Sequence, residues 1–260
     1  MRLAFVVGAS AGGMGAHVAM LADGCAAAGM TVSVFAPEAT GVRLFRPGSS
    51  AFPPGPDEGA SLAAEAARPG GGGSGWSGGF TQVEIGDRPR PAGDVAAVLA
   101  LRRELRRCGP DVVHAHGLRA GALTALALAG RDRPPLAVTV HNAPSAGAAG
   151  RVYGVLEWVV ARRADAVTWV SADLGERLRR AGARDAGRAL VPAPPAPAPS
   201  PAETAAVRAE LRAGDRPVVL AAGRLTRQKG FGTLIAAAAE WRDRRPVPLL
   251  VIAGDGPLAP

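Results

Sequence analysis

The sequence predicts an α/β protein with one complete domain followed by part of a second domain. Three observations lead to this prediction. Short segments rich in Val, Ala and Leu alternate with helical stretches, as expected when helices cover a sheet. The first strand and helix lead directly into another strand, which makes a βαβ unit. A run of prolines, Pro192–Pro201, then separates this long series of elements from a shorter one.

The strands are expected where short apolar segments lie between turn residues. They are Leu3–Val7, Thr31–Phe35, Asp111–His116, Leu136–His141, Ala166–Val170, Ala189–Val191, Val218–Ala222 and Leu249–Ala253. The helices are expected in the stretches between them. They are Val18–Ala28, Ala92–Cys108, Ala120–Ala129, Tyr153–Arg163, Ala172–Ala181, Ala202–Arg212 and Thr233–Glu240, with a short helix near Ser61–Ala67.

The domain boundaries follow from composition. We assign residues 1–192 to the first domain, 193–201 to a stiff Pro/Ala linker and 202–260 to the second domain. Within the first domain, residues 47–79 are rich in Gly and Pro and are interpreted as a low-complexity surface loop. Because an independent domain usually needs about 100 residues or more, the segment 202–260 is interpreted as an incomplete domain.

Composition and charge narrow the class of protein. The net charge of +8 favours contact with anionic partners, such as phosphorylated substrates or an anionic membrane surface. The arginines do not cluster with aromatic residues, which argues against nucleic acid. Cys25 and Cys108 lie far apart without metal-ligand spacing, so neither a disulfide scaffold nor a zinc site is expected. A cytoplasmic protein without a membrane-spanning helix is expected.

A glycine-rich loop, Ser10–His17, follows the first strand. Its glycines do not have the Gly-x-Gly-x-x-Gly spacing of dinucleotide-binding proteins, which argues against an NAD-dependent oxidoreductase. Backbone N–H groups at the start of a helix nevertheless attract anions. The loop therefore predicts an anion site, and the alternative is a tight turn that only requires glycine.

Histidines lie at the carboxyl ends of two predicted strands. His114 and His116 are two residues apart and should point to the same side of their strand. Two histidines without a third ligand do not make a metal site, so no metal is expected. His141 ends the next strand, followed by Asn142, the only asparagine. Because open α/β sheets bind ligands at this edge, His141 is predicted to contact substrate.

Lys229 is the only lysine among the thirty basic residues of the chain. It lies with Arg224 on a loop between a predicted strand and a predicted helix, a position where α/β proteins bind phosphates. A site shaped for a compact ammonium does not readily accept a guanidinium. Arg224 and Lys229 are therefore predicted to bind a diphosphate, and the alternative is a solvated surface lysine.

Five motifs occur in order along the chain: Gly12–His17, Asp111–His116, Val138–His141, Gly223–Gly230 and Val251–Pro257. Together they resemble the retaining GT-B glycosyltransferases of family 4, which include bacterial mannosyl- and N-acetylglucosaminyltransferases. The resemblance extends from residue 1 to residue 257. It implies two Rossmann-like domains that face a cleft, the first for an acceptor and the second for a nucleotide sugar.

The resemblance also implies roles for individual residues. Gly12 and Gly13 would bind the donor diphosphate through backbone N–H groups, and Arg224 and Lys229 would neutralise it. His141 would contact the transferred sugar. Stabilisation of the leaving diphosphate by Arg224 and Lys229 would make these two residues catalytic, together with His141.

The remaining candidate residues are His17, His116 and Asn142, which are predicted at the acceptor or in the cleft. One of His114 and His116 is expected to be a packed or hydrogen-bonding residue at the mouth of the cleft. The reaction implied is transfer of a hexose from a nucleotide-diphosphate sugar to an acceptor hydroxyl with retention of configuration. Neither a cofactor nor a metal is expected. The acceptor would be a small or lipid-linked molecule, with peripheral contact at the inner membrane face left open.

The sequence departs from the family pattern at its end. Family members continue past the Gly-Asp-Gly-Pro segment into a region whose two glutamates hold the donor sugar and ribose, and this sequence stops at Pro260. We therefore expect a truncated enzyme that is inactive as this 260-residue chain. The alternative is a non-catalytic remnant that acts at most as a binding domain.

Overall fold

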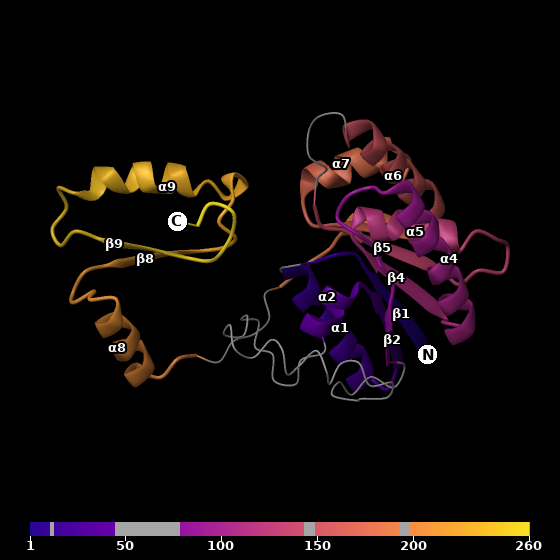
Figure 1. Cartoon of the computed structure of the whole chain (residues 1–260), viewed down its shortest axis with the longest axis horizontal. Coiled ribbons are helices and arrows are strands. Elements are labelled where there is room, and N and C mark those ends of the chain that lie inside the picture. Colours follow the sequence, from indigo (N-terminus) through magenta and orange to yellow (C-terminus); the bar gives the residue numbers. More distant parts are fainter. Residues whose placement is uncertain (11–12, 45–78, 143–148, 193–197, 260) are drawn as a thin grey trace. The chain divides into compact units, whose positions relative to one another are not determined.

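The computed structural model describes residues 1–10, 13–44, 79–142, 149–192 and 198–259. The chain forms two compact units, Met1–Pro195 and Ala196–Pro260, called unit 1 and unit 2 below. Figure 1 shows both units. No helix in the described ranges has the length and apolarity needed to cross a membrane.

Unit 1 contains a seven-stranded sheet with the order β3-β2-β1-β4-β5-β6-β7. All neighbouring strands are parallel. The strands are β1 (Arg2–Val7), β2 (Thr31–Ala36), β3 (Gly79–Gln82), β4 (Val112–His116), β5 (Leu136–Val140), β6 (Ala166–Trp169) and β7 (Ala186–Arg188). The predicted α/β class is confirmed, and the parallel sheet explains why central strands such as β1 are largely apolar runs.

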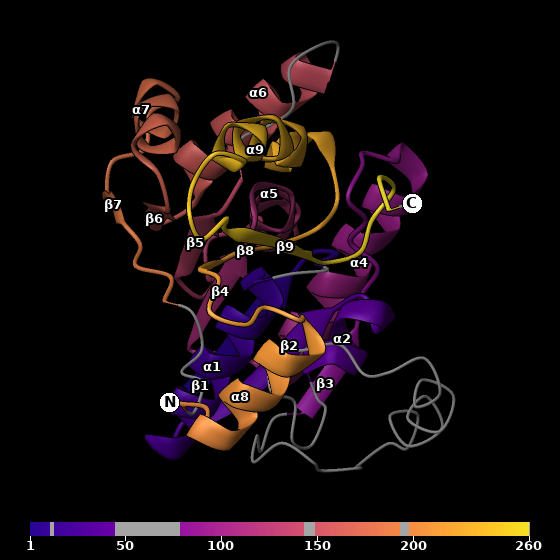
Figure 2. The same cartoon turned by 90° about the vertical axis from the view of Figure 1, so that its left-hand side faces the viewer.

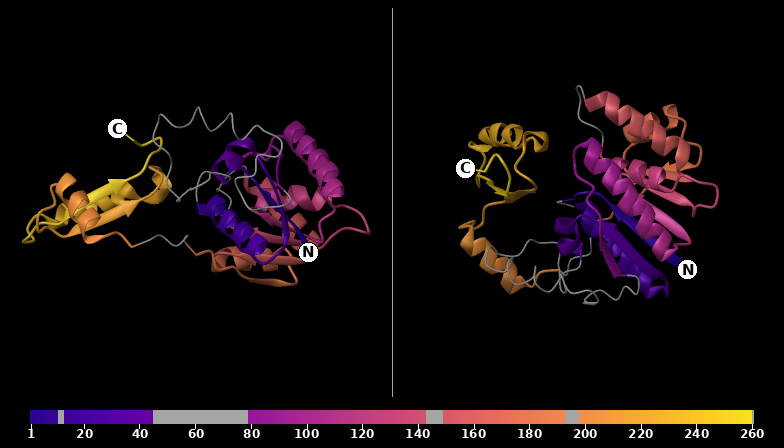
Figure 3. Two further views of the ribbon diagram at one scale, coloured as in Figure 1. Left: turned by 90° about the horizontal axis from the view of Figure 1, so that it is seen from below. Right: turned by 45° about the vertical axis from the view of Figure 1, so that its right-hand side comes forward.

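Helices cover the two faces of this sheet. One face is covered by α4, α5, α6 and α7, and the opposite face carries α1 and α2 (Figures 1 and 3). Their bounds are α1 (Gly13–Ala27), α2 (Glu38–Leu44), α4 (Pro91–Cys108), α5 (Leu118–Ala127), α6 (Ala149–Arg163) and α7 (Ala172–Arg180). The covered faces form two apolar clusters, one on each side of the sheet.

Local chemistry sets the ends of α4. Pro91 occupies the first turn, where its missing N–H costs no hydrogen bond. Asp94 lies in the first turn and Arg106 in the last, so both charges complement the helix dipole. Gly109 then ends the helix in the left-handed conformation, with φ of 54°, and its N–H donates to the carbonyl oxygen of Leu105.

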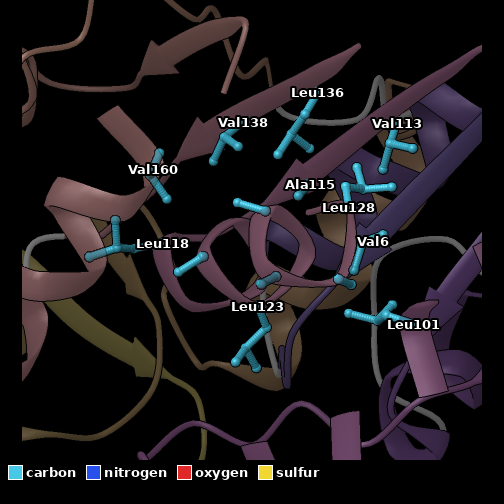
Figure 4. Close-up of a cluster of buried hydrophobic side chains, with 14 of the residues drawn as sticks. Val6, Leu101, Val113, Ala115, Leu118, Leu123, Leu128, Leu136, Val138 and Val160 are labelled. Atoms are coloured by element: carbon cyan, nitrogen blue, oxygen red, sulfur yellow. The ribbon is translucent and has the colours of Figure 1, made fainter. Parts of the chain in front are cut away.

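The larger apolar cluster surrounds α5, as Figure 4 shows. Small residues let this helix lie close to the sheet. A Cβ atom on Gly121 would stand 2.5 Å from a methyl carbon of Val138, so only glycine fits there. Side chains from α4, the strands and α6 complete the cluster, among them Leu101, Val6, Val113, Leu136 and Val160.

Several predicted boundaries in unit 1 are wrong. Helix α1 begins at Gly13 rather than Val18, because the glycines are compatible with a first helical turn. The last strand is Ala186–Arg188 rather than Ala189–Val191, since its pairing partner β6 ends at Trp169. Helix α2 and strand β3 were not predicted. Residues 45–78, which contain nearly all of the predicted loop 47–79, lie outside the described residues.

Unit 2 is built around two parallel strands, β8 (Val218–Ala222) and β9 (Leu249–Ala253). Helix α8 (Pro201–Glu210) precedes them, and α9 (Phe231–Ala238) connects them and lies along one face of the pair (Figure 2). Two short 3-10 turns, η1 (Arg227–Lys229) and η2 (Ala239–Trp241), flank α9. Among the described residues of this unit only Ala213 is buried.

Candidate functional site

The strand order of unit 1 reverses direction at β1. The chain builds outward from β1 through β2 to β3 and then returns to β4 on the other side of β1. A crevice opens at such a switch point, beyond the carboxyl ends of the two central strands. At this edge, β1 leads toward the start of α1, and β4 ends at His116.

All four histidines of the chain meet near this edge. His114 and His116 point to the same side of β4, as predicted, with ring centroids 4.1 Å apart. The ring of His141 stacks on that of His116 at 5.4 Å. His17, from the second turn of α1, meets His116 edge-to-face at 5.9 Å. We call these four residues the histidine cluster.

A ladder of side-chain hydrogen bonds supports one end of the cluster. Nε2 of His114 lies 2.8 Å from the hydroxyl oxygen of Thr139, and that oxygen lies 2.8 Å from the hydroxyl oxygen of Thr168. The three residues come from the adjacent strands β4, β5 and β6. The ladder fixes the ring of His114, against which His116 packs.

A second hydrogen bond joins the two residues nearest the carboxyl edge. Nδ1 of His116 lies 3.1 Å from Nε2 of His141. His116 is fully buried, and its Nε2 has no hydrogen-bond partner among the described residues. The same is true of Nδ1 of His17, which is 5% exposed. His141 and His114 are each partly exposed, and His141 lies beyond the end of its strand, next to the exposed Asn142.

Burial keeps the cluster neutral. It lowers the pKa of His141 to about 4, with a smaller contribution from His17. Burial, His141 and His17 lower the pKa of His114 to about 4 as well. Burial also lowers the pKa of His17 and, far more strongly, that of His116. At neutral pH each imidazole is therefore an uncharged hydrogen-bonding group.

The cluster is not arranged as a metal site. In the described part of the chain, no group of three or more His, Cys, Asp or Glu side chains is placed to hold a metal ion. The imidazoles pack ring against ring, and two of their nitrogens bond to each other. A metal would need several such nitrogens to converge on one point.

The other predicted residues of unit 1 are distributed around the cluster. Gly13 is exposed and begins α1, where the first N–H groups have no partner within the helix. Asn142 is exposed next to His141. His17 and His116, which were predicted at the acceptor or in the cleft, are buried and pack against the other histidines. Gly12 lies outside the described residues.

A cavity of about 320 Å³ lies between the segment after β3 and the first turns of α4. Sequence reasoning did not identify it. Arg119, just inside α5, lines it and forms an ion pair with Asp94, while its Nε–H donates to the carbonyl oxygen of Gly86 at 2.9 Å. Because Arg119 follows His116 by only three residues, this cavity belongs to the same edge of the sheet.

In unit 2, Arg224 and Lys229 lie between β8 and α9, as predicted. Both side chains are exposed, and neither guanidinium nor ammonium pairs with a carboxylate in the described residues. Lys229 ends η1, and Gly230 follows in the left-handed conformation, with φ of 68°, as the residue before α9. Two positive charges without a carboxylate partner in the described residues thus lie on the loop that leads into a helix.

A second segment holds this loop in place. The N–H of Leu225 donates to the carbonyl oxygen of Asp255 at 2.8 Å. A Cβ on Gly254 would stand 2.0 Å from the carbonyl oxygen of Gly223, and one on Gly256 would stand 2.6 Å from that of Leu225. The motif Gly254–Gly256 therefore packs directly against the backbone that carries Arg224.

Residues 11–193 match the profile of the family described as Glycosyltransferase Family 4. The chain is also 49% identical over 63 residues to alpha-D-kanosaminyltransferase from Streptomyces kanamyceticus. This alignment covers 23% of the chain and 16% of that enzyme.

Solved structures resemble nearly the whole chain. HepE from Anabaena, in complex with UDP, matches with a TM-score of 0.67 and 18% identity over 99% of this chain and 62% of its own. Sucrose-phosphate synthase from Thermosynechococcus elongatus matches with a TM-score of 0.63 and 20% identity over 98% of this chain and 62% of its own. The chain thus spans about 62% of the length of these structures, and at such identity they show the shared fold.

Proposed function

Because this chain belongs to glycosyltransferase family 4 and shares the GT-B fold of its structural neighbours, we propose that it serves to transfer a hexose from a nucleoside-diphosphate sugar to an acceptor hydroxyl with retention of configuration. The observation that carries this proposal is the family match over residues 11–193. UDP in the HepE structure supports the choice of donor class.

The charges of unit 2 fit the leaving group of this reaction. As the bond from the sugar to the diphosphate breaks, negative charge grows on the diphosphate oxygens. Arg224 and Lys229 carry unpaired positive charges that would stabilise it, and the α9 helix dipole would add to them. Since these groups supply the positive charge, we propose a reaction without a metal ion, so a chelator should leave transfer unchanged.

Unit 1 would contribute neutral hydrogen-bonding groups. The exposed start of α1 at Gly13 offers backbone N–H groups to a diphosphate oxygen. His141 would bond to a hydroxyl of the transferred sugar. Its pKa of about 4 makes it a weak base at neutral pH, which suits a binding role better than proton abstraction. Attack by the acceptor on the face that the leaving group vacates does not require a base in this unit.

We propose the 320 Å³ cavity of unit 1 as the acceptor site. It lies at the same edge as the histidine cluster, and its lining combines small apolar residues such as Ala97 with the fixed polar groups of Arg119 and Asp94. A sugar or polyol hydroxyl could bond to these groups. The acceptor is then a small molecule, or the head of a lipid-linked one brought to an anionic membrane by the charge of +8.

The proposal is tested by titrating the chain with UDP and UDP-glucose and by following sugar release or transfer by proton NMR. The expected result is binding of both nucleotides by the 260-residue chain, which the sequence predicts to be inactive. In a chain that also includes the donor-sugar region implied by the family resemblance, we expect a product with the anomeric configuration of the donor. Product of the opposite configuration would contradict retention. Binding without turnover in that longer chain would favour the binding-domain alternative, and absence of binding by any nucleoside-diphosphate sugar would contradict both.

A further inference from the structure

We propose that His116 is a positioning residue that sets the tautomer of His141. In this arrangement the Nδ1–H of His116 donates to Nε2 of His141, so the proton of His141 resides on its Nδ1. His141 then presents a hydrogen-bond donor, rather than an acceptor, on its remaining nitrogen.

The argument begins with the bond between the two rings. A neutral imidazole has one nitrogen that donates and one that accepts. The 3.1 Å contact between Nδ1 of His116 and Nε2 of His141 therefore allows two arrangements. Either His116 donates and His141 accepts, or the reverse. Each arrangement also determines whether the second nitrogen of each ring carries a proton.

The buried nitrogen of His116 distinguishes the two arrangements. If His141 donated, the proton of His116 would sit on its Nε2, which is buried and has no partner among the described residues. A buried N–H without an acceptor is among the rarest defects in folded proteins. If His116 donates, its single proton is used in the hydrogen bond and only a lone pair is left without a partner. The second arrangement is therefore favoured.

The packing keeps His116 in the orientation that this bond needs. Its ring lies 4.1 Å from that of His114, which the Thr139–Thr168 ladder fixes, and 5.8 Å from that of Phe5. His17 closes a third side at 5.9 Å. Because burial lowers the pKa of all four imidazoles, neither ring of the pair gains a second proton near neutral pH.

The consequence concerns what His141 can bind, and this step rests on the proposed function. A His141 that carries its proton on Nδ1 would donate to an oxygen of the donor sugar. The oxygen of a hydroxyl, or of an acylamino carbonyl, would accept this bond, whereas a protonated amino group could not. His116 would thus restrict the sugars that His141 accepts without contacting any of them.

The tautomers can be measured in the 260-residue chain without any sugar. Histidine labelled with ¹⁵N in the ring, observed by long-range ¹H–¹⁵N correlation at pH 7.5, reports which nitrogen of each imidazole is protonated. We expect both His116 and His141 to carry the proton on Nδ1. A proton on Nε2 of His141 in the wild-type chain would overturn the proposal, whatever the outcome of the nucleotide titrations.

Three variants test whether His116 is the cause. His116→Leu removes the donor, so the Nε2-protonated form of His141 should appear. His116→Asn keeps an N–H near the position of Nδ1 and should preserve the wild-type tautomer. His114→Phe is the matched control, because it keeps a flat ring against His116 and removes only imidazole nitrogens that make no hydrogen bond to His141. The proposal would be contradicted if His141 kept its proton on Nδ1 in His116→Leu. It would also be contradicted if His141 lost the Nδ1-protonated form in folded His116→Asn.

Discussion

The two units differ sharply in how well they bury similar residues. Leu136, in a strand of unit 1, is 1% exposed, whereas Leu220, in a strand of unit 2, is 64% exposed. Seven strands with helices on both faces enclose apolar side chains in unit 1. In unit 2, two strands and α9 leave most apolar side chains in contact with water. Similar strand sequences therefore give a core only where enough layers surround them.

The units also differ in the kind of functional group they carry. Unit 1 holds neutral imidazoles in fixed positions through packing and side-chain hydrogen bonds. Unit 2 carries free positive charges on a loop held by backbone contacts between Gly223–Leu225 and Gly254–Gly256. Precise orientation thus depends on a core, whereas a charged loop can be positioned by local backbone packing alone.

Hydrogen exchange should show the largest difference between the units. Backbone amides in β1 and β4 should exchange only when the core of unit 1 unfolds. Those in β8 and β9 have little buried area to protect them. A difference of about 4 kcal/mol in opening free energy corresponds to roughly a thousandfold in exchange rate. Exchange followed by mass spectrometry measures this, and equal protection of the two strand pairs would contradict the comparison.

A matched pair of leucine substitutions should separate the units next. Leu136→Ala removes a fully enclosed side chain and should lower the unfolding free energy of unit 1 by about 2–5 kcal/mol. Leu220→Ala removes an exposed one and should change the stability of unit 2 by about 0.5 kcal/mol or less. Denaturant titrations with probes in each unit test both values. A large loss from Leu220→Ala would mean that its side chain is covered in solution.

Substitution of Lys229 tests the charges of unit 2. In a sugar-transfer assay on a chain that includes the donor-sugar region, Lys229→Ala should lower kcat/KM by roughly 10²–10³-fold through weaker stabilisation of the diphosphate. Lys229→Arg should recover little, because a planar guanidinium does not replace a compact ammonium. UDP binding should weaken by about tenfold, which a titration shows without turnover. Arg244→Ala, which removes an exposed charge away from this loop, is the control, and equal losses in both alanine variants would contradict a specific role.

Acidification should affect the two units differently. The pKa of His114 and of His141 is about 4 in the folded chain, against 6.5 for ordinary histidine, so the unfolded chain binds protons first. Unit 1 should therefore lose stability as the pH falls from about 6.5 to about 4, by up to about 1.4 kcal/mol per pH unit for each such histidine. Unit 2 has no histidine and lacks this contribution.

Thermal unfolding of each unit between pH 7.5 and pH 4 checks this prediction. His114→Leu should reduce the slope for unit 1, because one of the titrating groups is gone. The same slope in wild-type and variant chains would show that carboxylates, rather than the histidine cluster, dominate the acid response.

Much of the fold could be predicted because its signals are local. Apolar strands such as Leu3–Val7 and Val218–Ala222 lie close to the observed β1 and β8. The misses were segments whose structure depends on tertiary contacts. Strand β3 reads Gly-Phe-Thr-Gln and pairs with β2, which supplies a register that no local pattern in such a short segment reveals. Strand β7 is shorter still, with three residues, and its pairing depends on β6.

The sequence identified the histidines of the candidate site, but not the hydrogen bonds and ion pairs that hold them and their neighbours in place. The position of His141 at a strand end followed from sequence, but the hydrogen bond to His116 depends on strand register. Thr139 and Thr168 were missed, although each is a polar residue inside an apolar strand at matching register. That pattern could have identified them. The pair of Arg119 and Asp94 joins helices 25 residues apart and leaves no local signal.

The exposure of Lys229 has a practical consequence for chemistry on this protein. As the only lysine of the chain, it shares primary-amine reactivity with the α-amino group of Met1 alone. Mild acylation near neutral pH would therefore modify only these two amines. The extent of modification of Lys229, measured by mass spectrometry, would report on the accessibility of its loop. A nucleotide that occupies the loop would shield Lys229 and leave Met1 unchanged, so each molecule carries its own internal reference.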